Sequence, residues 1–115
     1  MNKKTTKAAI KRDALKEVNR GRRALGMKRI AKLPKGIVQD NDACPIANSL
    51  HLEITSAGTA MAPNYPAAEA LSAVWKTALG DHFEGRYEVD LPYNLSDFVE
   101  RFDKGEFPEL ETLDA

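Results

Sequence analysis

The first part of the chain carries apolar residues at helical spacing on an otherwise basic background. These apolar positions are Ile10, Ala14, Val18 and Leu25. The stripe predicts one amphipathic helix from about Thr6 to Leu25. Gly21 is expected to weaken this helix by roughly 1 kcal/mol relative to Ala, and Gly26 is expected to end it.

Residues 27–45 combine turn-forming residues with scattered apolar ones. We interpret them as an ordered connector that its apolar side chains hold against the rest of the protein. A short helix is expected from Pro45 to Leu50, because proline at the first helical position loses no hydrogen bond and has a preset φ. Cys44 would then lie near the N-cap of that helix.

Apolar and polar residues alternate from Leu50 to Ile54 and again from Tyr87 to Leu91. Alternation of this kind predicts half-buried strands, and Gly58 is expected to turn the chain into a further short strand at Thr59–Ala62. We interpret residues 81–84 as an exposed polar turn.

Two further helices are predicted in the second half of the chain. Pro66 to Leu79 carries its apolar residues on one side, with Gly80 as the expected stop. Leu95 to Phe102 has apolar residues at positions i, i+3, i+4 and i+7, with Asn94 as its expected cap and Gly105 at its end.

Together these elements predict an α+β fold. We expect a small antiparallel sheet of about three strands, packed with two main helices across one face and preceded by the basic N-terminal helix. We divide the chain into a basic helix and arm, residues 1–35, and a small acidic α+β domain, residues 36–115, which is expected to fold without residues 1–25. Most of the buried area is expected from aromatic side chains, at roughly 1.5–3 kcal/mol for each one fully buried. They are Trp75, Phe83, Tyr87, Phe98 and Phe102.

Three segments carry a resemblance to known sequences: Leu33-Pro34-Lys35-Gly36, the stretch from Cys44 to Leu50, and the stretch from Phe98 to Leu110. In these segments the chain resembles small uncharacterised proteins of actinobacteria and their phages. The resemblance implies a bacterial or phage origin. It implies no activity, cofactor or catalytic residue, because none is known for that group.

Charge is divided unevenly along the chain. Residues 1–35 hold 13 basic and 2 acidic residues, and the remainder holds 4 basic and 15 acidic ones. The formal net charge of zero therefore combines a part of +11 with a part of −11. Such asymmetry indicates a polyanionic partner, or an arm that neutralises its own body.

Basic residues on several faces of a helix neutralise phosphates and release counterions, which gives salt-sensitive and largely sequence-independent affinity for nucleic acid. We therefore predict a non-enzymatic, nucleic-acid-associated accessory or regulatory protein, with DNA favoured over RNA. No helix-turn-helix pair or aromatic RNA platform can be traced, so base-specific readout is not expected. The residues predicted to contact phosphates are Lys7, Lys11, Arg12, Lys16, Arg20, Arg22, Arg23, Lys28 and Arg29.

Other interpretations stay open. The protein could be a protein-binding module, phage-encoded, that captures or inhibits a host protein. The basic helix could lie on acidic patches of a neighbouring subunit in a homo-oligomer, or be simply solvated. The acidic surface of the last third could steer the protein to a basic partner or imitate the phosphates of DNA.

The sequence offers little material for catalysis or metal binding. Cys44 at a helix N-terminus could have a lowered pKa, but a general base would have to be His51 or His82, and we predict a structural thiol. The histidines and the cysteine have no zinc-binding spacing. Residues 40–42 open like a calcium loop, yet Pro45 and His51 occupy the positions that need Gly and Glu. We expect no enzyme activity, no cofactor and no metal.

The expected location is the cytoplasm. A single cysteine excludes an internal disulfide and suits a reducing compartment. No apolar stretch approaches the roughly 20 residues that span a bilayer. The first residues are followed by more Lys and Arg, and not by the apolar segment of a secretory signal.

Overall fold

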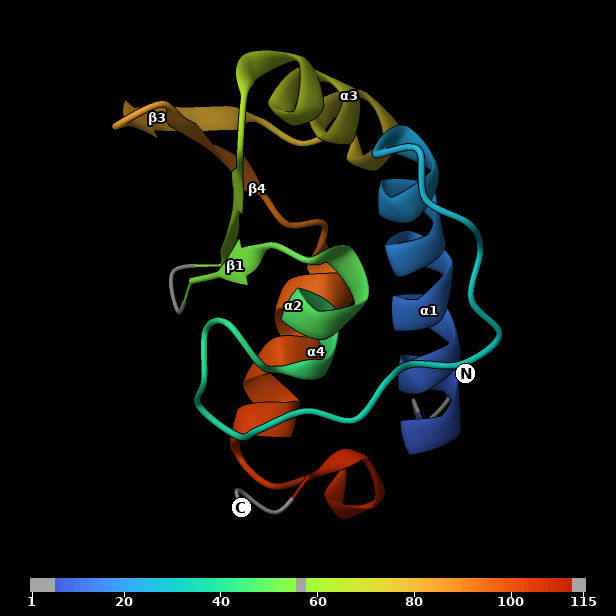
Figure 1. Ribbon diagram of the computed structural model, residues 1–115. Coiled ribbons are helices and arrows are strands. Elements are labelled where there is room, and N and C mark those ends of the chain that lie inside the picture. Colours follow the sequence, from blue (N-terminus) through green and yellow to red (C-terminus); the bar gives the residue numbers. More distant parts are fainter. Residues whose placement is uncertain (1–5, 56–57, 113–115) are drawn as a thin grey trace, which may run out of the picture.

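The computed structural model of the protein describes residues 6–55 and 58–112, and Figure 1 shows how they are arranged. The helices are α1 (Lys7–Ala24), α2 (Pro45–Leu50), α3 (Tyr65–Trp75), α4 (Tyr93–Asp103) and the 3-10 helix η1 (Pro108–Leu110). The strands are β1 (Glu53–Ile54), β2 (Thr59–Ala62), β3 (Leu79–Phe83) and β4 (Arg86–Asp90). This is the predicted α+β fold, with one strand more than expected. Within the described residues, no helix combines the length and the hydropathy that crossing a bilayer requires.

The strands form one antiparallel sheet in the order β1-β2-β4-β3. β1 and β2 make the predicted hairpin, with Ile54 opposite Ala60, and β4 pairs with the other edge of β2. β1 is shorter than the alternation from Leu50 to Ile54 predicts, because Leu50 is the last residue of α2. α3 packs against β4 and β2, whereas α4 packs chiefly against α1 and α2 (Figure 1). The two main helices therefore do not both cover the sheet as expected, because the apolar stripe of α4 is buried among the other helices.

The second predicted helix is shorter than its apolar pattern indicates. It ends at Trp75 instead of Leu79, because Lys76 adopts the left-handed conformation with φ 56°. The backbone N–H of Lys76 donates to the carbonyl oxygen of Ser72, which closes the last turn. The prediction that Gly80 stops this helix is wrong, since Gly80 lies inside β3.

The predicted polar turn at residues 81–84 is also wrong, because most of it belongs to a strand. β3 pairs with β4 through a hairpin in which both Glu84 and Gly85 have positive φ, the pattern of a two-residue type I′ turn. Every residue of β3 is exposed. The strand therefore has no alternation of buried and exposed positions that could reveal it in the sequence.

α4 begins earlier than predicted. Pro92 occupies the N-cap position without a side-chain hydrogen bond, and Tyr93 is the first helical residue. Asn94 lies inside the helix, so its predicted capping role is wrong. The predicted end is confirmed, since the helix stops just before Gly105, which has a φ of +82°.

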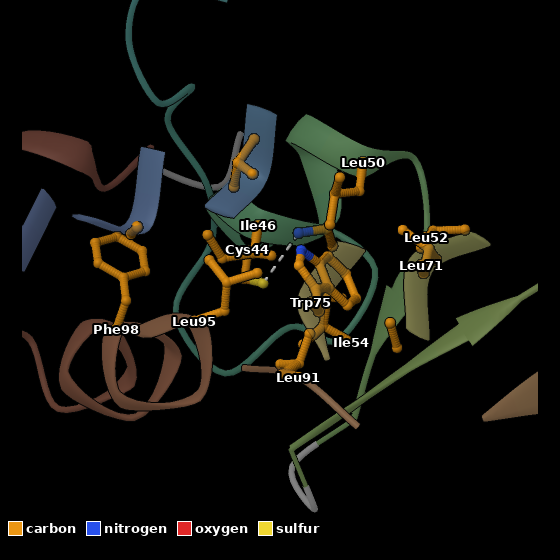
Figure 2. Packing of buried hydrophobic residues seen from close by; sticks show 14 of the residues in the cluster. Cys44, Ile46, Leu50, Leu52, Ile54, Leu71, Trp75, Leu91, Leu95 and Phe98 are labelled. Carbon is orange, nitrogen blue, oxygen red and sulfur yellow. Dashed lines mark hydrogen bonds between the residues drawn. The ribbon is translucent and has the colours of Figure 1, made fainter. Parts of the chain in front are cut away.

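One buried cluster joins the helices and the sheet, and Figure 2 shows part of it from close by. The predicted aromatic residues that are buried are Trp75, Phe98 and Phe102. Two others are not core residues as predicted: Phe83 is 52 % exposed on β3, and Tyr87 is half-buried. Phe107, which no pattern singled out, is completely buried and contacts Phe98, with the ring centroids 4.9 Å apart.

Helix α1 belongs to this same cluster. It packs against α2, α3 and α4, and its basic residues occupy the remaining faces. The expectation that residues 36–115 fold without residues 1–25 treated the helix as a loosely attached arm. Because α1 packs into the core, we expect instead that the chain does not fold cooperatively once residues 1–25 are removed. The inward-facing residues of α1 are Ile10, Ala14, Val18 and Gly21.

Candidate nucleic-acid interface

The C-terminal end of α1 turns the chain back along the helix. Gly26 has a φ of +77°, the predicted glycine stop. The N–H of Met27 donates to the carbonyl oxygen of Arg22 at 2.7 Å, and that of Gly26 donates to Arg23 at 3.1 Å. This pair of hydrogen bonds is a Schellman motif. The connector then runs beside α1, as the cyan segment of Figure 1 shows.

Two side chains of α1 hold the returning connector in place. The amide of Asn19 donates to the carbonyl oxygen of Ile30 at 3.0 Å and accepts from its N–H at 2.9 Å. The guanidinium of Arg22 donates through Nε to the carbonyl oxygen of Lys28 and through Nη1 to that of Ser49, both at 2.6 Å. The connector is therefore fixed to α1 through the backbone groups of Lys28 and Ile30.

An open groove of about 580 Å³ lies between α1 and the connector. Partly buried Leu15 and Met27 form its apolar floor, and Asn19 also lines it. The cations that line the groove are Arg12, Lys16, Arg20, Arg23 and Arg29. Among the residues the structure describes, no carboxylate lines it. The groove thus combines a basic rim with an apolar floor.

A second hollow of about 350 Å³ continues the groove toward the start of α1. It shares Arg12 and Leu15 with the first. Its other lining residues repeat the same combination of cationic and aliphatic side chains: Ala8, Lys11, Ala31, Lys32, Leu33 and Leu110. The two hollows together follow one face of α1 along most of its length.

The rim cations differ in how far acidic neighbours neutralise them. Arg20 pairs with Glu17 at 3.2 Å, and Arg12 lies 3.5 Å from Asp13. Both arginines stay mostly exposed, so these pairs are weak. Within residues 6–55 and 58–112, no carboxylate lies within 4.0 Å of the other three rim cations. These are Lys16, Arg23 and Arg29.

Lys11 is engaged at the junction with the C-terminal segment. Its ammonium donates to the carboxylate of Glu109 at 2.8 Å. This hydrogen bond lowers the pKa of Glu109 below its ordinary value. Lys11 therefore brings less free positive charge to the second hollow than Lys32 does.

The structure brings together five of the nine residues predicted to contact phosphates, and these are the rim cations. Lys11 lines the second hollow. Lys7 and Lys28 are exposed but line neither hollow. Arg22 is different, because its guanidinium is taken up by backbone carbonyl groups. Lys3 and Lys4, which add to the predicted charge of the arm, lie outside the described residues.

Sequence reasoning missed Asn19 and the two floor residues. Leu15 lies off the apolar stripe of α1, and Met27 falls in the connector. Asn19 did carry a signal, because asparagine is an unfavourable residue inside a helix unless its side chain has a hydrogen-bonding task. The partner of that side chain, the backbone of Ile30, could not be predicted without the path of the connector.

Cys44 occupies the N-cap of α2, as predicted. Its sulfur accepts a hydrogen bond from the N–H of Ala47 at 3.4 Å, drawn as a dashed line in Figure 2. Burial of the side chain raises the pKa of the Cys44 thiol above its ordinary value. His51 lies at the opposite end of α2, and His82 stacks on Tyr87 in the β3–β4 hairpin with the ring centroids 4.5 Å apart. Neither histidine therefore lies at the N-cap of α2, where the thiol is.

Within residues 6–55 and 58–112, no three His, Cys, Asp or Glu side chains come close enough together to hold a metal ion. The groove along α1 is consequently the arrangement with the clearest chemistry.

The chain matches no family model, and no match emerges among curated proteins or solved structures.

Proposed function

We propose that the protein is a non-enzymatic accessory or regulatory protein that binds the phosphate backbone of a nucleic acid in the groove along α1. The observation that carries the proposal is the clustering of five cations around the groove with no carboxylate among its described lining residues. Clustered cations raise the local potential and attract a polyanion, whereas the same charges spread over the surface would not.

The chemistry of the rim suits phosphate. Four of its five cations are arginines, and the planar guanidinium can donate two parallel hydrogen bonds to one phosphate. From Ala8 to Arg23 the helix axis extends about 22 Å, at about 1.5 Å per residue. That length matches about six base pairs of duplex DNA. The groove can therefore contact several successive phosphates.

The dependence of binding on salt tests the proposal. Affinities for duplex DNA and for RNA are measured by electrophoretic shift at several salt concentrations, with the wild type and with Arg23→Gln/Arg29→Gln. Each lost phosphate contact lowers the slope of log K against log salt by about 0.9 for duplex DNA and about 0.7 for a single strand. We expect the double variant to lower both affinity and slope.

The matched control is Arg86→Gln/Lys104→Gln. It removes the same formal charge from β4 and from the end of α4, where neither residue lines the groove. We expect this variant to bind as the wild type does. Absence of binding by the wild type even at low salt would refute the proposal, and an equal loss in both variants would show that the groove is not the site.

The cellular setting is part of the proposal. The resemblance of three segments to small proteins of actinobacteria and their phages supports a bacterial or phage origin. The single buried thiol of Cys44 suits a reducing compartment such as the cytoplasm.

A second candidate function is a protein-binding module that captures or inhibits a host protein. It is supported by the exposed edge strand β3, where Leu79 is 40 % and Phe83 52 % exposed. Exposed apolar residues on an unpaired strand edge can pair with another chain. A pull-down that survives nuclease treatment, is lost with Phe83→Ser and persists with Tyr93→Ser would favour this candidate, since Tyr93 is exposed elsewhere.

A further inference from the structure

The groove along α1 has an apolar floor as well as a basic rim, and phosphates alone leave that floor unused. We infer that its occupant is an unpaired nucleic-acid strand, with phosphates on the rim cations and bases against Leu15 and Met27. This inference rests on the proposed function and makes it more specific.

Shape separates a single strand from a duplex. A duplex presents its phosphates on a convex surface and stacks its bases inside, so it has no apolar group to offer a concave floor. An unpaired strand can turn its bases out and lay their faces on apolar or planar side chains, while its backbone follows a basic groove. A floor of partly buried Leu15 and Met27 beside five cations fits the unpaired strand.

The kind of cation points the same way. Arginine and lysine both bind phosphate, but only arginine has a planar group that can stack on a base. Arg12, Arg20, Arg23 and Arg29 all line the groove. Because no aromatic side chain lines it among the described residues, we expect binding that tolerates many base sequences.

Continuity supports a strand that runs along the helix. The second hollow shares Arg12 and Leu15 with the first and adds Leu33 and Leu110 as apolar residues and Lys32 as a cation. A partner that repeats an anionic and an apolar group in every unit can follow both hollows. Nucleotides of an unpaired strand repeat in this way.

Fluorescence anisotropy with the full chain and four labelled probes tests the inference. The probes are a short oligothymidine, an abasic strand of the same length, a duplex of the same length, and a polyglutamate peptide. The oligothymidine and the abasic strand carry the same phosphates, so their difference reports the bases. We expect the oligothymidine to bind more tightly than the abasic strand, because only the oligothymidine has bases to lay on the apolar floor.

Variants then separate floor from rim. Met27→Ser and Leu15→Thr are expected to weaken binding of the oligothymidine, leave the abasic strand unchanged and keep the salt slope. Arg29→Gln is expected to weaken both strands and to lower the slope by about 0.7. Leu79→Ser, an apolar to polar change on exposed β3, is the control and is expected to change neither.

The outcomes distinguish the inference from the function on which it rests. If the abasic strand or the duplex binds as tightly as the oligothymidine, the inference is overturned and the proposed function stands. If no nucleic acid binds, both fail. If polyglutamate binds most tightly, the groove is a site for an acidic protein segment and the inference is again overturned.

Discussion

The indole ring of Trp75 packs against the backbone of α1 at Gly21, where an added Cβ would lie 2.7 Å from Cζ2 of the ring. The indole N–H donates to the carbonyl oxygen of Glu17 at 3.0 Å and so fixes the ring on the helix. Leu50 closes the same contact, 3.1 Å from the added Cβ. The glycine that weakens α1 as an isolated helix is therefore the place where α1 docks on α3 and α2.

Gly21→Ala is expected to destabilise the protein. Overpacking at this contact costs about 1–3 kcal/mol, and the better helix propensity of Ala returns about 1 kcal/mol. We expect the free energy of unfolding in urea to fall by up to about 2 kcal/mol. Ala73→Gly on the exposed face of α3 measures the propensity effect alone, at about 0.5–1 kcal/mol. Higher stability of Gly21→Ala than of the wild type would show that the close contact does not exist.

Removal of residues 1–25 is expected to abolish cooperative thermal unfolding, because the remaining chain would expose the surface that Ile10, Ala14 and Val18 cover. Point variants give the matched test in the full chain. Val18 is fully buried, and Val18→Ala should lose about 1–3 kcal/mol. Lys16→Ala on the exposed face should stay within about 0.5 kcal/mol of the wild type. A sharp melting transition of the truncated chain would contradict the role of α1 in the core.

Elements with one buried face could be predicted from the sequence. The stripes of α1 and α4 and the alternation around Ile54 and Val89 each reflect burial on one side, and the structure buries those sides. Helix ends at Gly26 and Gly105 were predictable because a positive φ favours glycine.

Features that depend on distant contacts could not be predicted. β3 is exposed along its whole length, so its pairing with β4 leaves no pattern in its own residues. Phe107 lies outside any periodic segment and is buried through its contact with Phe98. The same holds for the site. The excess of cations could be predicted from the sequence. Which cations lie together depends on how the connector runs back along α1, and the hydrogen bonds of Asn19 fix that path.

The buried thiol of Cys44 is expected to make stability depend on alkaline pH. Burial raises its pKa in the folded protein above the ordinary value of about 9.0. The unfolded chain therefore releases the proton first, and the stabilisation is complete below pH 9.0 and is lost as the pH rises toward the folded value. The loss is at most about 1.4 kcal/mol per pH unit.

Cys44→Ser isolates this effect, because serine can keep the N-cap hydrogen bond but does not ionise in this range. At neutral pH the variant should lose at most about 1–2 kcal/mol. Denaturation series from neutral to alkaline pH should show the difference between wild type and variant shrinking above the ordinary pKa of the thiol. A rapid reaction of the native thiol with a thiol reagent at neutral pH would contradict its buried, protonated state.

The two hydrogen bonds between Asn19 and Ile30, here called the clamp, are expected to shape the groove without adding a positive charge that binds phosphate. Asn19→Ala removes both hydrogen bonds between Asn19 and Ile30, so Arg29 is held beside α1 less firmly, chiefly through the contact of Arg22 with Lys28. Stability should fall by about 1–2 kcal/mol, within the range for lost hydrogen bonds. Affinity for nucleic acid should fall severalfold with little change in the salt slope, because no cation is removed.

Asn48 provides the matched control, because it holds the same connector at its other end. Its amide donates to the carbonyl oxygens of Lys35 and Ala43 at 2.9 and 3.0 Å, and it does not line the groove. Asn48→Ala should therefore cost a similar free energy of unfolding and leave binding unchanged. If both variants weaken binding equally, the effect of Asn19 reflects general stability, and the groove does not depend on the clamp.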